Sequence, residues 1–166
     1  LFVGGFDLIH TLAYKGMGVF PGHDADLPTQ FWISARYIES LSFLAASLFM
    51  HAKLRLKVVA AGYVLLTLLF LSAIFYWGVF PHCFVEGEGL TAFKKTSEYI
   101  ISLILLIALA LLFQKRQEFD RRVFQWLAAS MLLTVASELA FTLYVDVYGI
   151  ANMVGHLLKI LSFFLS

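Results

Sequence analysis

Six ionisable side chains lie in three pairs inside segments that are otherwise apolar enough to cross a membrane. The two members of each pair are three residues apart: Asp7 with His10, Arg36 with Glu39, and His156 with Lys159. Residues with this spacing share one face of a helix. Because a charge in hydrocarbon is costly, such a face normally points toward a protein interior, a cavity or a ligand. The sequence therefore predicts helices whose charged faces turn away from lipid.

Composition places the chain among integral membrane proteins. Of the 166 residues, 61% are hydrophobic and 14% are charged, whereas a soluble domain has about 25% charged residues. We expect an all-α polytopic transmembrane bundle with about six spans, forming one domain over residues 1–166. Only fourteen residues precede Lys15, and a crossing needs about 20, so we expect a fragment that is truncated at both ends. The predicted helical segments are 1–15, 29–52, 56–78, 94–114, 120–146 and 149–166.

Charged residues between these segments predict the orientation. Seven basic residues gather in two turns, Lys53–Lys57 and Lys115–Arg122, whereas three lie in the opposite loops. Basic loops favour the cytoplasmic side, so we expect both chain ends to be cytoplasmic. A stop and N-cap at Pro28-Thr29 would begin the second span. The outer loops would then carry His23, Asp24, Asp26, Glu86 and Glu88.

Counted from the outer ends of the spans, the ionisable groups of four spans lie at a similar depth. At about 1.5 Å per helical residue, seven of them lie roughly 8 to 15 Å deep, with Glu98 just above. We call these eight candidate ligand-binding residues the outer-half charges: Asp7, His10, Arg36, Glu39, Glu98, Glu138, His156 and Lys159. On the fifth span, a polar stripe at helical spacing must face other helices: Ser130, Thr134, Ser137, Glu138 and Thr142. Trp32 is expected at headgroup level, as interfacial tryptophans are.

A charge count indicates what the outer-half charges would do. With neutral histidines, four carboxylates oppose only Arg36 and Lys159, which leaves two negative charges in a medium of low dielectric. Either carboxylates are protonated, or His10 and His156 are charged, or a cation binds. Each alternative describes a site that responds to protons or to a ligand. The residues leave open a purely structural reading, in which buried ion pairs fix the helix register.

Cofactor chemistry is not favoured by the pattern, although two alternatives stay open. Haem could be ligated by His10 and His156, but only Gly4, Gly5 and Gly155 would make room nearby. A soft metal could bind His82 and Cys83 with Glu86 and Glu88 in the outer loop, but the ordered ligand spacing of a zinc site is absent. The sequence therefore assigns no metal or cofactor.

Catalytic and transport functions have weaker support than binding. The chain has no zinc-protease, nucleophile-elbow or phosphate-loop motif, so we expect a non-catalytic domain. A transporter or a haem or redox membrane protein is the runner-up, yet the inverted repeats of transporters are not visible. A third reading is a passive anchor that dimerises output domains. The net charge of +1, without a basic stripe, excludes nucleic acid as a partner.

Several runs of the chain closely resemble the third family of membrane-associated sensor (MASE) domains. They include HTLAYKGMGVFP at 10–21 and ASELAFTLYVDVYG at 136–149, and the likeness spans nearly the whole chain. Further runs are 27–32, 35–40, 75–77, 80–87, 97–99 and 155–159.

This resemblance implies a sensory input domain of the bacterial inner membrane. In such proteins the domain precedes cytoplasmic PAS, histidine-kinase, GGDEF or EAL domains, and two-component or cyclic di-GMP outputs usually need a homodimer. We therefore expect the lipid bilayer, an unidentified small ligand and output domains downstream of residue 166 as partners. Binding of the ligand or of a proton would change charge pairing and shift the last span.

Overall fold

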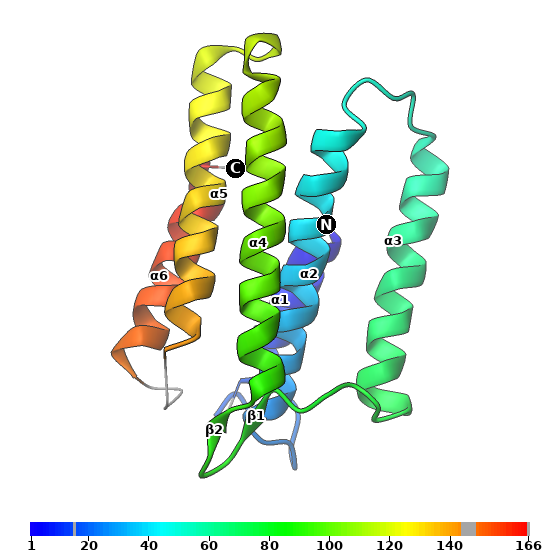
Figure 1. Ribbon diagram of the computed structural model, residues 1–166. Helices are drawn as coiled ribbons and strands as arrows, with labels where there is room; N and C mark the ends of the chain where they lie inside the picture. Colours follow the sequence, from blue (N-terminus) through cyan, green and yellow to red (C-terminus); the bar gives the residue numbers. More distant parts are fainter. Residues whose placement is uncertain (15, 144–148, 166) are drawn as a thin grey trace. The chain divides into compact units, whose positions relative to one another are not determined.

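The computed structural model describes residues 1–14, 16–143 and 149–165, and these residues are almost entirely helical (Figure 1). A short antiparallel hairpin, β1 (Phe84–Val85) with β2 (Gly89–Leu90), precedes the fourth helix. The predicted all-α helical bundle is confirmed. The helices of the described residues are α1 (Phe2–Ala13), α2 (Asp26–Leu48), α3 (Leu56–Leu71), α4 (Ala92–Gln114), α5 (Arg121–Phe141) and α6 (Ile150–Leu165).

Three helical stretches in the described part of the chain are long and apolar enough to cross a membrane. They are Leu56–Tyr76, in which a π-helical turn extends α3, together with Ala92–Gln114 and Arg121–Phe141. The apolar helices α1 and α6 are shorter, with 12 and 16 residues. Helix α2 has 23 residues but carries charged groups within its length. A helical membrane protein is therefore confirmed, while the count of six spans stays a prediction.

The chain divides into two compact units. Unit 1 comprises Leu1–Glu39 and Phe49–Lys94, and unit 2 comprises Ser40–Leu48 and Lys95–Ser166. Helix α2 contributes to both, because its first fourteen residues belong to unit 1 and the rest to unit 2. Each unit is described by itself below.

An aromatic core holds unit 1 together. The ring of Phe6 on α1 lies 6.1 Å from the rings of Phe31 on α2 and Phe70 on α3. Phe20, from the glycine-rich loop after α1, stacks on Phe75 in the π-helical turn after α3, with the ring centroids 5.9 Å apart. The loop is thereby folded back onto the helices. This core fixes α1 beside α2, and it is there that charged side chains of the two helices meet.

Helix α2 begins three residues earlier than the sequence predicted. Thr29 is not its N-cap, because the Thr29 hydroxyl donates to the carbonyl of Ala25 at 2.7 Å, one turn back within the helix. Pro28 lies in the first helical turn, where its missing N–H needs no partner and its fixed φ suits the helix. The proline therefore starts the helix rather than preceding it.

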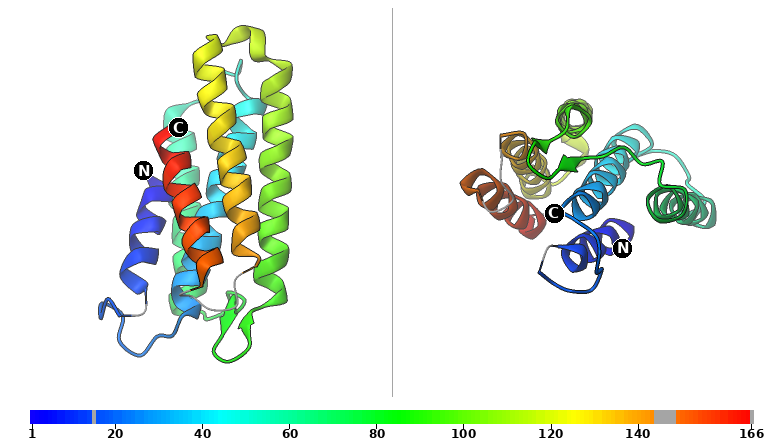
Figure 2. Two further views of the ribbon diagram at one scale, coloured as in Figure 1. Left: turned by 90° about the vertical axis from the view of Figure 1, so that its left-hand side faces the viewer. Right: turned by 90° about the horizontal axis from the view of Figure 1, so that it is seen from below.

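A seam of small polar residues joins α5 and α6 in unit 2, where the two helices lie side by side (Figures 1 and 2). Ser130 donates to the carbonyl of Ser162 at 2.9 Å, and Ser137 donates to the carbonyl of Gly155 at 2.8 Å. Thr134 Oγ1 lies 3.0 Å from the hydroxyl of Ser162. Three members of the polar stripe predicted on the fifth span thus face α6. Polar side chains of membrane helices commonly form such interhelical hydrogen bonds.

Close approach of the two helices depends on Gly155. A Cβ added at this residue would lie 2.6 Å from Cε1 of Phe141, well inside van der Waals contact. Small residues allow such approach between membrane helices. Helix α5 ends at Phe141, and the predicted extension over 144–146 lies outside the described residues.

Candidate functional site

Two of the three predicted pairs meet at one guanidinium group in unit 1. Arg36 Nη1 donates to Oε2 of Glu39 on the same helix, and Nη2 donates to Oδ1 of Asp7 on α1. The i,i+3 spacing places Arg36 and Glu39 on one face of α2, while the core contact of Phe6 brings Asp7 toward that face. The ion pair between Arg36 and Asp7 therefore joins two helices.

Trp32 forms one wall of this site. The Arg36 guanidinium lies 4.6 Å from the Trp32 ring centroid, within the range of a cation–π interaction. Trp32 is only 6% exposed, so the protein covers its ring, and its position at headgroup level stays a prediction. The sequence could have indicated the contact between Trp32 and Arg36, because they are four residues apart and residues i and i+4 share a helix face. The Trp32 ring lies on the same face of α2 as Arg36 and contacts the guanidinium group inside the protein.

His10 completes the group. Its ring lies 5.3 Å from the Trp32 ring, and its Nδ1 lies 2.7 Å from the carbonyl oxygen of Pro28. A carbonyl oxygen can only accept, so the geometry requires a proton on Nδ1. This hydrogen bond fixes the orientation of the imidazole. We refer to Asp7, His10, Trp32, Arg36 and Glu39 together as the Arg36 cluster.

Burial is uneven within the Arg36 cluster. The Arg36 side chain is 0% exposed, whereas the side chains of Glu39 and Asp7 are 11% and 23% exposed. Within the cluster, two carboxylates share one guanidinium. The cation is thus held in the interior, and Asp7 is the more exposed of its two carboxylate partners. Chemically, the cluster can exchange one carboxylate partner of Arg36 without exposing the arginine itself.

The other four outer-half charges belong to unit 2. Glu98 and Glu138 are 0% exposed, and Lys159 is 2% exposed. Lys159 Nζ lies 3.5 Å from the Thr134 hydroxyl and 4.7 Å from the ring centroid of Phe163. The buried ammonium group thus joins the polar seam between α5 and α6.

His156, the remaining predicted residue, packs at the same helix pair. Its ring meets the edge of the Phe141 ring with the centroids 5.0 Å apart. All four residues of unit 2 therefore lie at or near buried positions. This is expected, because exposing a charged side chain to hydrocarbon is energetically costly. That all eight outer-half charges form one site stays a prediction.

Asp26 is an important residue that the sequence reasoning placed in a solvated loop. It is 6% exposed, and its Oδ1 accepts the backbone N–H groups of Cys83 at 2.6 Å and Phe84 at 2.9 Å. Its Oδ2 accepts from the Gln30 amide at 3.2 Å and lies 2.7 Å from Nδ1 of His82. Asp26 therefore ties the start of α2 to the hairpin. Partners 57 residues away leave no signal in the local sequence.

The loop around His82 does not support the soft-metal alternative. Within the described residues, no group of three or more histidine, cysteine or acidic side chains could hold a metal ion. Beside Asp26 lies a cleft of about 220 Å³, whose lining combines His23 and His82 with the apolar side chains of Ile74 and Phe75. None of its lining residues belongs to the Arg36 cluster, so the cleft and the cluster can be tested separately.

Comparison with known families decides what kind of domain carries these features. The family model of MASE3, described as a membrane-associated sensor domain, matches residues 1–166. The chain belongs to the MASE3 family. Comparisons with curated proteins and with solved structures gave no match. The resemblance found in the sequence is confirmed over the full length, and this MASE3 domain is a membrane sensory domain.

Proposed function

We propose that this MASE3 domain detects a small ligand, or the proton itself, at the Arg36 cluster and controls cytoplasmic output domains of a bacterial signalling protein. The observation that supports this is the sharing of Arg36 between Asp7 of α1 and Glu39 of α2. The output would be a histidine kinase or a diguanylate cyclase in the same polypeptide, acting as a homodimer. The domain itself would contribute no catalysis.

Exchange of the Asp7 partner is the proposed switching event. A ligand that offers an anionic group to Arg36, or a proton that neutralises Asp7, removes the charge pairing between α1 and α2. A hydrogen bond to a charged group contributes about 1.5 to 3 kcal/mol, and about 1.4 kcal/mol changes an equilibrium constant tenfold. Loss of this one contact is therefore enough to change the populations of two helix arrangements.

Helix α2 offers a route from the Arg36 cluster into unit 2. The same helix continues to Ser47, whose hydroxyl lies 3.2 Å from the carbonyl of Ala108 on α4. The Ser47 carbonyl in turn accepts from the Lys115 ammonium group at 2.8 Å. A shift of α2 along its axis would disturb both contacts. Transfer through α6 to the output domains would complete the path.

The experiment uses the full-length protein with its own output domain in membranes. We expect Asp7→Asn and Arg36→Gln to change the basal output and to weaken its dependence on stimulus, while both variants stay in the membrane fraction. Glu88→Gln is the matched control, because Glu88 is an exposed carboxylate at the hairpin of the same unit. Wild-type output and stimulus response in both cluster variants would contradict the proposal.

A cofactor-bearing redox function is the second candidate, and one observation favours it. The ring of a metal-bound histidine almost always donates its other N–H to a carboxylate, a carbonyl or water, which is what Nδ1 of His10 does toward Pro28. An absorption spectrum of the purified protein would reveal a haem by its intense visible bands. A His10→Ala variant that loses such bands would favour the redox protein over the ligand sensor.

A further inference from the structure

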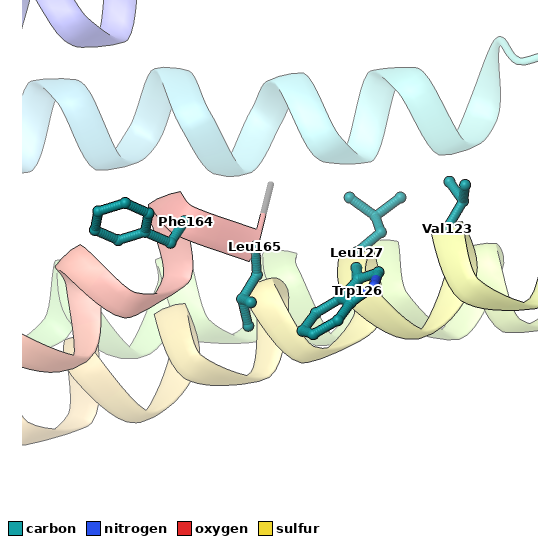
Figure 3. Close-up of a pocket in the computed structure, with 5 residues that line it drawn as sticks. All are labelled: Val123, Trp126, Leu127, Phe164 and Leu165. Atoms are coloured by element: carbon teal, nitrogen blue, oxygen red, sulfur yellow. The ribbon is translucent and has the colours of Figure 1, made fainter.

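A larger cleft lies in unit 2, where the first turns of α5 meet the last turn of α6. Its volume is about 440 Å³, within the roughly 300 to 1,000 Å³ typical of small-molecule sites. Figure 3 shows the side chains that line it: Val123, Trp126 and Leu127 from α5, and Phe164 and Leu165 from α6. Trp126 is 57% exposed and Phe164 is 83% exposed. The lining side chains are hydrocarbon apart from the indole N–H of Trp126, which suits an acyl chain.

Two arginines at the start of α5 are adjacent in sequence to the residues that line this cleft. Arg121 and Arg122 directly precede Val123, and Arg122 is one helical turn from Trp126 on the same face of α5. Both are exposed, and in the part of the chain that the structure describes neither guanidinium takes part in an ion pair. The carboxylate of Asp120 accepts the backbone N–H of Arg122 at 2.8 Å and so caps the helix. Both arginine side chains are therefore available to an anion.

The neighbouring basic residues are already engaged. Arg116 donates to the carbonyl of Phe113 at 3.2 Å, and its guanidinium lies 4.6 Å from the Phe113 ring centroid. The ammonium group of Lys115 is held by the carbonyl of Ser47. The four basic residues of this turn thus divide into two that are bound within the protein and two that are not. This difference supplies a matched control.

We propose that the cleft binds one anionic phospholipid, with its phosphate on Arg121 and Arg122 and an acyl chain between α5 and α6. Charge complementarity identifies the headgroup, because two available guanidinium groups at a helix N-terminus favour phosphate. The apolar lining identifies the chain, and Trp126 lies where a headgroup-level tryptophan is expected. The turn is predicted to be cytoplasmic, and anionic lipids give that leaflet its negative surface potential. A lipid in this position contacts both helices and holds the end of α6 against α5.

The test measures phospholipid binding to the purified domain in detergent by native mass spectrometry. The probes are dioleoyl-phosphatidylglycerol and dioleoyl-phosphatidylcholine, which have the same acyl chains and differ in headgroup charge. We expect one bound phosphatidylglycerol, held about tenfold more tightly than phosphatidylcholine, because the choline cation of phosphatidylcholine offsets the attraction of its phosphate to the two guanidinium groups. The double variant R121Q/R122Q should lose this preference. Val123→Trp, which fills the cleft at a half-exposed position, should lower the affinity for both lipids.

Arg116→Gln is the control, and it should bind phosphatidylglycerol as the wild type does. All substituted positions are exposed, so the variants should unfold at the wild-type temperature. Equal affinity for the two lipids would overturn the proposal, and so would an Arg116→Gln effect as large as that of R121Q/R122Q. A concentration-dependent dimer that Val123→Trp dissociates would instead identify a second copy of the chain as the occupant.

Discussion

Replacing Arg36 with glutamine removes the cation that Asp7 and Glu39 share and leaves their two carboxylates close together. The structure predicts that the effect of a second substitution, Asp7→Asn, then changes sign. In the wild type, Asp7→Asn removes a charged contact between α1 and α2 and should destabilise the fold. In the Arg36→Gln background, the same substitution removes a repulsion and should stabilise it.

Burial sets the size of these effects. The Arg36 side chain is 0% exposed, and removal of one partner from a buried ion pair costs about 3 to 5 kcal/mol. Asp7 is 23% exposed, so we expect Asp7→Asn alone to cost about 1 to 2 kcal/mol, near the lower end for charged hydrogen bonds. In the double variant the total should fall below that of Arg36→Gln alone. The coupling energy of the pair should then be about 2 to 3 kcal/mol.

The assay is thermal unfolding in detergent, followed by the helical circular dichroism signal, for the wild type, both single variants and the double variant. Free energies of unfolding from the four proteins give the coupling energy directly. If the two substitutions act additively, within about 0.5 kcal/mol, the residues do not interact energetically. Additivity would refute the reasoning that places the α1–α2 switch at this pair.

Three further substitutions test other parts of the structure. Gly155→Ala places a Cβ 2.6 Å from the Phe141 ring and should destabilise the domain by about 1 to 3 kcal/mol; Phe141→Leu in the same chain should restore part of the loss in thermal unfolding. Asp26→Asn should release the hairpin, measured as faster hydrogen exchange at residues 83 and 84, whose N–H groups lose their carboxylate acceptor. Ser137→Ala removes one interhelical hydrogen bond and should cost only about 0.6 kcal/mol, the average for such bonds in membranes, in the same unfolding assay.

Helix positions were largely predictable because apolar length and charged turns give strong signals. The segment predicted at 94–114 corresponds to α4, and the one at 56–78 to α3 with its π-helical turn. The hairpin was not predicted, since two strands of two residues each carry no periodic pattern. The early start of α2 was missed because a proline in a first helical turn looks the same in sequence as one that precedes a helix.

The candidate site was predictable within a helix and much less so between helices. Spacing of three residues placed Arg36 and Glu39 on one face, and the structure confirms that they pair. The contact of Arg36 with Asp7 joins residues 29 positions apart, and local periodicity carries no information on such distant pairing. The contact of Trp32 with Arg36 was not predicted, because an amphipathic ring suits both a headgroup layer and a cation inside the protein.

The two helix pairs of this domain differ in a way that bears on where a stimulus can act. Helices α5 and α6 are joined by serine hydroxyls that donate to backbone carbonyls, and the buried Lys159 ammonium group lies beside the Thr134 hydroxyl in the same seam. Helices α1 and α2 are joined by an ion pair whose carboxylate is partly exposed. The ion pair is the more accessible of the two connections, because Asp7 is 23% exposed whereas Lys159 is 2% exposed. Because α2 continues into unit 2, it is the helix by which, under the proposed function, a rearrangement at Arg36 would reach the contact of Ser47 with Ala108 on α4.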